Sequence, residues 1–310
     1  MSLQNKSVQG KKILITGLTG QVGYPVAVGL AGQNEVWGVA RFSDTRKRAD
    51  LEAKGVRCVA ADITKGDFSA LPTDFDYVLN FAVARGNVSF DDDIRDSAET
   101  VGLLMSHTRK SKAFLRCSTT GVYQHAGHKE LKETDDLGDN HRVAAKTYSI
   151  SKLCAEAVVR FAAREFKLPT IICRLNVPYG DNGGWPDYHV QDIKNGKPLY
   201  VHTERPSLFR LIHEDDIVAT IPALVGAAAV PARILNWGGD TVVSLEEWCE
   251  YLGELVGKRP NFQYTDQAIA TVLPDVTEMS KITGPLRTDW KEGLRRMVAA
   301  RYPEWLKKSA

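Results

Sequence analysis

The chain has 310 residues, and 40 Lys and Arg against 38 Asp and Glu leave a formal net charge of +2. A chain of this length forms one large domain or two that share an interface. Its 43% of hydrophobic and 25% of charged residues exclude a disordered, collagen-like or disulfide-dense protein. The balanced charge offers no broad field for nucleic acid or an anionic membrane, so we expect neither as a partner. Any bound anion must be held by a local site.

The cysteines are scattered along the chain and form no CxxC pair; they stand at positions 58, 117, 154, 173 and 249. Such a set is typical of reduced thiols in a reducing compartment. Residues 1–10 are polar and lack the apolar core of a secretory signal. No stretch approaches the roughly 20 apolar residues of a membrane helix. The sequence therefore predicts a cytoplasmic protein.

Short apolar runs alternate with helical patterns through the first half of the chain. Strands are predicted over residues 11–16, 35–40, 56–60, 77–82, 113–118 and 170–175. Helices are predicted over residues 22–32 and 45–54, and over a segment that begins near Tyr148 and ends near Arg164. Continuous apolar strands separated by helices indicate a parallel sheet that is covered on both faces.

The pattern changes after Asn176. Gly and Pro cluster between residues 178 and 198, which is typical of loop-rich structure. A strand over 234–237, a helix over 244–256 with Ser244 as N-cap and Glu247 three residues later, and a helix over 291–302 follow. The predicted fold is therefore α/β, a doubly wound parallel sheet with a smaller, discontinuous C-terminal lobe. The sheet domain would comprise residues 1–177 with 210–240 returning to it, and the substrate-binding lobe would comprise 178–209 and 241–310.

A glycine-rich turn follows the first predicted strand and leads into a helix. Its sequence is Thr16-Gly17-Leu18-Thr19-Gly20-Gln21-Val22-Gly23, with GxxGxxG spacing. In that context the glycines permit a tight turn and a close approach of backbone N–H groups to a pyrophosphate at the helix N-terminus. An ordinary strand-to-helix turn is the alternative. The residues predicted to contact a dinucleotide here are Gly17, Thr19, Gly20, Gln21, Val22 and Gly23.

The end of the second predicted strand bears on the choice of dinucleotide. NAD-binding proteins usually place an acidic residue there to bind the ribose 2′-hydroxyl, whereas this chain has Arg41. A guanidinium can pair with a 2′-phosphate, with Ser43 and Arg46 as further contacts. The sequence thus predicts NADP as cofactor, and NAD stays possible because Asp44 is close. The alternative is that Arg41 is a solvated residue at a strand end.

Two further segments carry groups that suit proton transfer. Residues 117–123 follow the fifth predicted strand and are rich in hydroxyls. Tyr148 and Lys152 are spaced i and i+4, so they share one helix face. A neighbouring ammonium would lower the pKa of Tyr148 towards the range of general acid–base catalysis. A hydroxyl beside them could hold a substrate carbonyl or alkoxide.

Together these motifs resemble the extended short-chain dehydrogenases/reductases, the NAD(P)-dependent epimerase/dehydratase family. The resemblance covers nearly the whole chain and implies a Rossmann fold. It also implies that Tyr148 is the general acid/base, that Lys152 binds the nicotinamide ribose and that Thr119 is the catalytic hydroxyl. Hydride would pass between nicotinamide C4 and a secondary carbinol carbon. Further matching segments are residues 61–63, 80–84, 118–123, 174–177, 211–217 and 236–239.

The resemblance implies further contacts in each half of the site. The additional cofactor-binding residues would be Asp62, Ile63, Phe81, Ala82, Asn176 and Val177. The substrate-binding residues would be Ser118, Thr120, Arg205 and Arg210. The two arginines stand where sugar-nucleotide enzymes often bind a diphosphate, and solvent-facing side chains are the alternative.

Three histidines, His125, His128 and His141, fall in the segment before the active-site helix. A substrate-facing histidine is a better interpretation there than a metal ligand, because no motif typical of a metal site accompanies them. We therefore expect no metal. We also expect a homodimer, because family members often pair two helices across an interface. Here those helices would lie near residues 96–110 and 149–165.

Three classes of function follow. The first is an NAD(P)-dependent, NADPH-preferring oxidoreductase that transfers hydride between nicotinamide C4 and a secondary alcohol or ketone. The alternative is a nucleotide-sugar epimerase with a retained NAD(P). A dehydratase is disfavoured because Thr120 and Gly121 stand where such enzymes usually have acidic residues. The third is a non-catalytic nucleotide sensor, against which Tyr148 and Lys152 argue.

Overall fold

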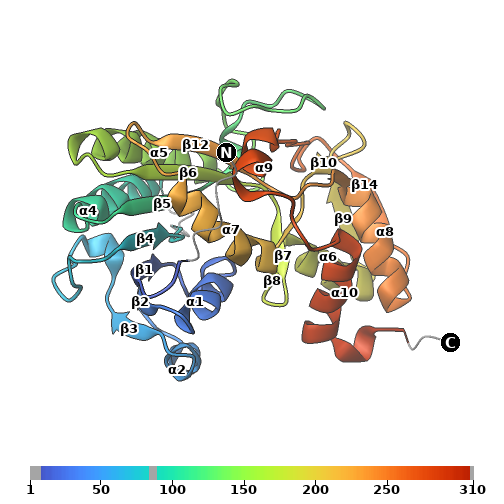
Figure 1. The fold of residues 1–310 in the computed structure, drawn as a ribbon. Coiled ribbons are helices and arrows are strands. Elements are labelled where there is room, and N and C mark those ends of the chain that lie inside the picture. The colour runs from blue at the N-terminus through green and yellow to red at the C-terminus, as the bar shows by residue number, and fades with distance from the viewer. Residues whose placement is uncertain (1–7, 84–88, 308–310) are drawn as a thin grey trace.

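A computed structural model describes residues 8–83 and 89–307. Ala84 of the 80–84 motif and most of the polar segment 1–10 lie outside the described residues. The centre of the molecule is a parallel sheet of seven strands in the order β12-β6-β5-β4-β1-β2-β3 (Figure 1). The strands are β1 Lys12–Thr16, β2 Glu35–Ala40, β3 Arg57–Ala60, β4 Tyr77–Asn80, β5 Ala113–Thr119, β6 Thr170–Leu175 and β12 Arg233–Trp237. The predicted doubly wound fold is confirmed.

Helices cover both faces of this sheet. In β1, Ile13 and Ile15 face one apolar cluster and Leu14 faces another, because side chains alternate along a strand. Burial on both faces explains the continuous apolar runs in the sequence. One face carries α1 Gly23–Ala31, α7 Glu214–Gly226 and α9 Thr277–Thr283, and the other carries α4 Thr100–His107 and α5 Tyr148–Glu165. At the β2–β3 edge lies α2 Thr45–Ala53 (Figure 1).

Strand positions agree with the sequence prediction, with ends that move by no more than two residues. The predicted segment 96–110 is interrupted. It begins within a π-helical turn over Arg95–Glu99, which follows α3 Phe90–Ile94 and leads into α4. π-Helical turns are frequent at functional sites, and this one lies beside the cavity described below.

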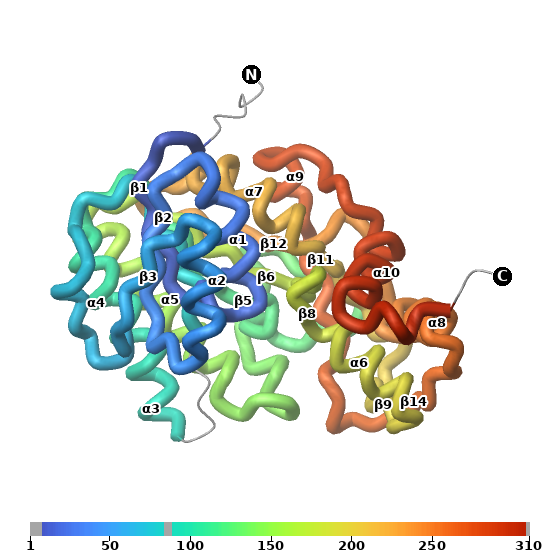
Figure 2. The backbone as a smooth tube through the Cα atoms, turned by 90° about the horizontal axis from the view of Figure 1, so that it is seen from below, coloured from blue at the N-terminus to red at the C-terminus, as the bar shows by residue number. Residues whose placement is uncertain are grey.

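A second lobe lies to one side of the sheet (Figure 2). It has its own apolar cluster, in which Trp185, Phe209 and Trp248 pack edge to face or tilted at centroid distances of 5.3–5.7 Å. Its elements are α6 Trp185–Lys194, α8 Leu245–Val256, α10 Trp290–Arg301, and the strand pairs β9 Pro198–Val201 with β14 Asn261–Tyr264 and β10 Leu208–Phe209 with β13 Val243–Ser244.

The boundary between the sheet domain and the second lobe differs from the predicted one at the segment 241–310. Strand β12 joins the sheet, while the later helix α9 also packs against α7 and β12. Part of the predicted lobe segment 241–310 therefore lies against the sheet. Three short strands run at the junction: β7 Pro178–Gly180, β8 Gly183–Gly184 and β11 Ile212–His213. Among the described residues no helix is long and apolar enough to cross a membrane.

Candidate active site

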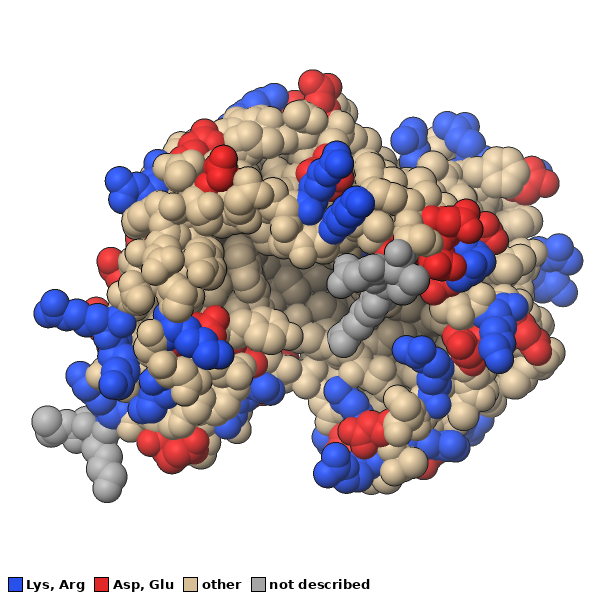
Figure 3. Space-filling view, turned by 180° about the vertical axis from the view of Figure 1, so that it is seen from behind, with Lys and Arg blue, Asp and Glu red and all other residues tan. Residues whose placement is uncertain are grey.

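A cavity of about 1050 Å³ lies at the carboxyl ends of the parallel strands and reaches the second lobe. Ligands of open α/β sheets bind at this edge. Figure 3 shows one face of the molecule hollowed at its centre, with most Lys, Arg, Asp and Glu around the rim. The predicted site residues that line the cavity are Gly17, Thr19, Gly20, Gln21, Val22, Gly23, Arg41, Asp62, Ile63, Phe81, Ala82, Ser118, Thr119, Thr120, Tyr148, Lys152, Asn176 and Val177.

The glycine-rich turn forms one wall. Gly17 has φ of +75°, and a Cβ there would lie 2.6 Å from the backbone nitrogen of Ala82. At Gly23, the first residue of α1, a Cβ would lie 2.4 Å from the carbonyl oxygen of Gly17. Both positions require glycine. The resulting turn leaves backbone N–H groups free to approach a pyrophosphate at the helix N-terminus, so the residues present fit a dinucleotide.

Arg41 is exposed and lines the end of the cavity near β2 and β3, together with Ser43 and Lys47. The nearby carboxylate of Asp44 caps α2. It accepts hydrogen bonds from the backbone N–H groups of Arg46 at 3.0 Å and Lys47 at 3.4 Å. One oxygen of Asp44, Oδ1, is therefore used by the backbone, and Arg41 and Asp44 both line this end of the cavity.

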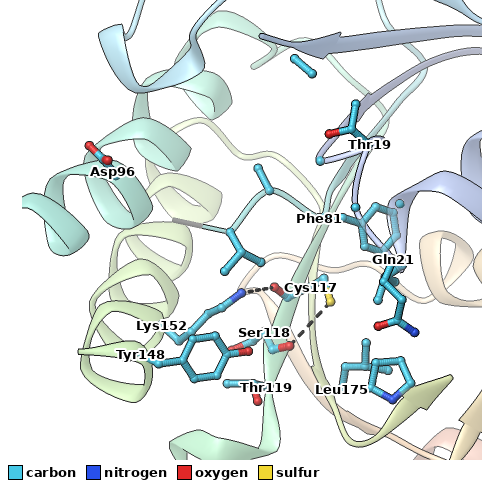
Figure 4. Close-up of a pocket in the computed structure, with 18 of the residues that line it drawn as sticks. Thr19, Gln21, Phe81, Asp96, Cys117, Ser118, Thr119, Tyr148, Lys152 and Leu175 are labelled. Atoms are coloured by element: carbon cyan, nitrogen blue, oxygen red, sulfur yellow. Dashed lines mark hydrogen bonds between the residues drawn. The ribbon is translucent and has the colours of Figure 1, made fainter. Parts of the chain in front are cut away.

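Tyr148 and Lys152 lie on α5 and point towards the end of β5 (Figure 4). Lys152 Nζ is 5.6 Å from the centroid of the Tyr148 ring and 3.4 Å from the carbonyl oxygen of Cys117, which accepts its hydrogen bond. Lys152 is only 2% exposed. Burial, with a further contribution from the Arg116 guanidinium, lowers the pKa of Lys152 to about 7. The predicted pair is thus brought together in a buried site.

The sequence predicts that the pKa of Tyr148 is lowered, and this prediction is wrong. Burial raises the pKa of Tyr148, and the Thr119 hydroxyl and the Arg116 guanidinium oppose this shift without reversing it. The physical reason is that the Tyr148 side chain is buried, so its charged phenolate would lose the solvation that water gives it. A Tyr–Lys spacing places the two groups but leaves out the cost of burying their charges.

The hydroxyls of Ser118 and Thr119, at the end of β5 before a 3₁₀ turn over Thr120–Val122, have different roles. Ser118 Oγ donates to Glu156 Oε1 at 2.5 Å, and Glu156 pairs with Arg174 at 2.8 Å in a buried network. Thr119 Oγ1 accepts from the backbone N–H of Gly121 at 3.1 Å, and the Thr119 hydroxyl also lies within hydrogen-bonding reach of the Tyr148 side chain. Thr119 is therefore the better hydroxyl donor to a ligand, although both residues line the cavity.

Thr120 and Asn176 also line the cavity, but their side chains bind protein groups. Asn176 Nδ2 donates to Thr120 Oγ1 at 2.7 Å and to the carbonyl oxygen of Val272 at 3.2 Å. Asn176 Oδ1 accepts from the backbone N–H of Arg210 at 2.7 Å. These contacts connect the end of β6 to the second lobe.

The structure corrects the prediction for the two lobe arginines, because neither lines the cavity. Arg205 is exposed, and its guanidinium carbon lies 4.4 Å from the ring centroid of Tyr264. Arg210 is buried, and four of its N–H groups donate to protein oxygens. The acceptors are Pro274 O at 2.9 Å, Gly239 O at 3.3 Å, Asp240 O at 2.7 Å and Glu130 Oε1 at 2.9 Å. A guanidinium engaged in this way anchors the lobe junction.

His141, one of the three histidines considered as substrate-facing, lines the cavity, and several lining residues lie outside the predicted site: Asp96, Cys117, Trp185, Phe209 and Ile269. His141 and Trp185 carry a signal in the sequence, since both stand in segments that the motifs bring near the site. Phe209 and Ile269 carry none, because tertiary packing alone places apolar lobe residues in the cavity. Within the described ranges, His, Cys, Asp and Glu form no group of three that could hold a metal ion.

Comparisons with known proteins identify the family and agree with the fold. Residues 13–238 match the family described as "NAD dependent epimerase/dehydratase family". No curated protein sequence matches the chain. A UDP-N-acetylglucosamine 4-epimerase from Methanobrevibacter ruminantium M1, in complex with UDP-N-acetylmuramic acid, superposes with a TM-score of 0.83 and 16% identity. The match covers 96% of this chain and 100% of that chain.

Two other solved structures are similar. A UDP-glucuronic acid 4-epimerase from Bacillus cereus, in complex with UDP-glucuronic acid and NAD, gives a TM-score of 0.78 and 19% identity over 93% of this chain and 98% of that chain. A dTDP-glucose 4,6-dehydratase from Streptomyces venezuelae with bound NAD gives a TM-score of 0.78 and 18% identity. That match covers 95% of this chain and 98% of that chain. On the family match, the chain belongs to the NAD-dependent epimerase/dehydratase family and is an enzyme of the short-chain dehydrogenase/reductase type.

Proposed function

We propose that this enzyme epimerises the sugar of a nucleotide sugar at a secondary carbinol carbon. The observation that carries the proposal is that one cavity joins three regions of the described chain. It contains the glycine-rich turn, the Tyr148–Lys152 pair and the lobe residues Trp185, Phe209 and Ile269. This arrangement leaves room for a dinucleotide and for a second ligand whose reacting carbon lies beside Tyr148.

Tyr148, Thr119 and Lys152 would each have a different role in such a reaction. A bound nicotinamide supplies a hydride acceptor that can return the hydride to the same carbon. Tyr148 takes the proton of the substrate hydroxyl and later gives it back. The Thr119 hydroxyl, which lies beside Tyr148, donates to the same substrate oxygen. Lys152 binds the nicotinamide ribose and, when protonated, stabilises the Tyr148 phenolate.

The named structural neighbours support this proposal over the reductase that Arg41 favours. Two are UDP-sugar 4-epimerases, and all three were solved with a nucleotide sugar or with NAD bound. The sequence argues against dehydration, because Thr120 and Gly121 follow Thr119. An NADPH-consuming ketone reductase is the second candidate, and the exposed Arg41 in the cavity is the observation that favours it.

We also propose that the site accepts NADP at least as well as NAD. Arg41, Ser43, Asp44 and Lys47 line the end of the cavity where a ribose 2′-phosphate would lie, and Oδ1 of Asp44 accepts hydrogen bonds from two backbone N–H groups. A guanidinium pairs with phosphate in two parallel hydrogen bonds, whereas a free carboxylate would repel it.

The experiment is to denature freshly purified protein, to identify any released nucleotide, and to titrate the emptied protein with NADPH and NADH. Tightly retained oxidised cofactor supports the epimerase, because that enzyme regenerates the oxidised form in each cycle. An empty protein that turns over ketones with a stoichiometric loss of NADPH contradicts the epimerase and supports the reductase.

A homodimer and a cytoplasmic location complete the proposal. The helices α4 and α5 expose large apolar side chains, Leu103 at 50% and Phe161 at 64% exposure, which suits a helix-to-helix interface. All five cysteines are unpaired, which agrees with a reducing compartment.

A further inference from the structure

His141 lies in the loop before α5 and lines the cavity beside Tyr148. The two rings stack with centroids 5.9 Å apart and planes inclined by 27°. Gly121 makes room for the imidazole, since a Cβ there would lie 2.7 Å from His141 Nδ1. The loop is held at this place because the backbone N–H of Asn140 donates to the Gly121 carbonyl oxygen at 3.2 Å. The histidine is therefore positioned against the catalytic tyrosine by its own loop.

The imidazole has hydrogen-bonding capacity that the protein does not use. His141 Nδ1 is buried beside Gly121 and has no partner among residues 8–83 and 89–307. A buried N–H without a partner is rarer than a buried lone pair, so we assign the ring proton to Nε2. Burial lowers the pKa of His141 to about 4, which keeps the ring neutral at neutral pH. The imidazole thus offers one neutral N–H donor on the side away from Gly121.

We propose that His141 is a substrate-binding residue whose Nε2–H donates a hydrogen bond to a sugar oxygen next to the carbon that reacts at Tyr148. This inference rests on the proposed nucleotide-sugar function and assigns a contact in the sugar half of the site. A neutral donor suits an uncharged hydroxyl or carbonyl oxygen, whereas a diphosphate would be bound better by a cation. The contact would therefore distinguish sugars by the oxygen they present there.

The test compares four proteins loaded with NAD: wild type, His141→Phe, His141→Gln and a control, His125→Phe. Phe keeps a planar ring without a donor, and Gln keeps a donor without the ring. His125 is 41% exposed, pairs with Glu204 at 2.8 Å and does not line the cavity. The dissociation constants of UDP-glucose, UDP-glucuronic acid, UDP-N-acetylglucosamine, dTDP-glucose and UDP alone are measured by calorimetry, and thermal unfolding checks each fold.

The proposal predicts that His141→Phe weakens binding of the nucleotide sugar that wild type binds best by roughly tenfold, as expected for one lost hydrogen bond. Binding of UDP, which lacks the sugar joined to the diphosphate, should stay unchanged, and His141→Gln should keep most of the affinity. Equal sugar binding by wild type and His141→Phe, or an equal loss for UDP, overturns the role of His141. If wild type binds none of the four nucleotide sugars, the proposed function itself fails, and the inference fails with it.

Discussion

Tyr148 and Lys152 lie one helical turn apart on α5, yet burial affects their pKa values in opposite directions. Replacing Tyr148 by Phe removes the proton carrier and leaves the ring in place. We expect turnover to fall by about 10²–10⁴-fold, the usual share of general acid–base catalysis. Cofactor affinity, measured by fluorescence titration, should change little. Tyr200→Phe, at a tyrosine that is 61% exposed on β9, is the matched control and should keep full turnover.

Lys152 predicts a dependence of stability on pH. Its folded pKa of about 7 is lower than that of a free lysine. Between about pH 7 and about pH 10, the unfolded chain therefore binds one proton more than the folded chain at this site. The destabilisation caused by burying Lys152 is thus complete below pH 7 and is relieved as the pH rises through this window.

The variant Lys152→Met tests whether burial of Lys152 destabilises the fold at neutral pH and less so at alkaline pH. We expect the variant to be more stable than wild type at neutral pH, by at least about 1 kcal/mol. The difference in the free energy of unfolding, measured by urea titration across the window, should shrink towards alkaline pH. A difference that stays constant or grows with pH would show that Lys152 is not buried with a lowered pKa.

Arg41 is the residue on which the NADP proposal depends. Arg41→Ala should weaken NADPH binding by about 10–100-fold, because a charge-assisted hydrogen bond contributes roughly 1.5–3 kcal/mol. The affinity for NADH should change by less than about threefold, since NADH has no 2′-phosphate. Titration of both cofactors on one protein sample separates these effects. An equal loss for both would assign Arg41 to another part of the dinucleotide, and no loss would make it a solvated side chain.

At the scale of elements, the sequence was most informative where the backbone chemistry is local. Continuous apolar runs predict every strand of the parallel sheet. The spacing of the glycines predicts the turn after β1. The capping box of α8 is also local. Ser244 Oγ accepts from the Glu247 N–H at 3.1 Å, and Glu247 Oε2 accepts from the Ser244 N–H at 2.8 Å.

The predictions from the sequence are wrong for residues whose contact partners are far away in the sequence. The sequence predicts that Arg210 binds a diphosphate. It does not reveal that the guanidinium donates to Glu130 and Pro274 instead, because these acceptors are 80 and 64 residues away. Ile269 reaches the cavity only through the packing of the lobe. The pKa of Tyr148 depends on how deeply the fold buries α5, which no i, i+4 spacing reveals.

The α8 capping box supports a stability prediction. Ser244→Ala leaves the Glu247 N–H without its side-chain acceptor and should lower the free energy of unfolding by about 0.5–2 kcal/mol. Urea unfolding of Ser244→Ala, Glu247→Ala and the double variant measures this. The two losses should not add, because each side chain depends on the other. Fully additive losses would mean that the box does not act as a unit.

At the scale of the whole molecule, the exposed apolar side chains of α4 and α5 predict a dimer. Phe161→Glu would place a charge on that face and should convert the dimer to a monomer in sedimentation velocity. Tyr200→Glu on the second lobe, at a side chain exposed to a similar extent, should leave the dimer intact. A monomeric wild type at micromolar concentration would contradict the proposed interface.

The measurement that tests the central proposal most directly is proton NMR of the purified protein mixed with a nucleotide sugar in deuterated water. UDP-glucose, UDP-glucuronic acid, UDP-N-acetylglucosamine and dTDP-glucose are each tested with NAD and with NADP. For at least one of them, we predict anomeric signals of a second sugar, no deuterium at the reacting carbon, and no net reduction of the cofactor. Tyr148→Phe should abolish the new signals. Failure to convert any of the four, or conversion only with stoichiometric oxidation or reduction of the cofactor, would contradict the epimerase.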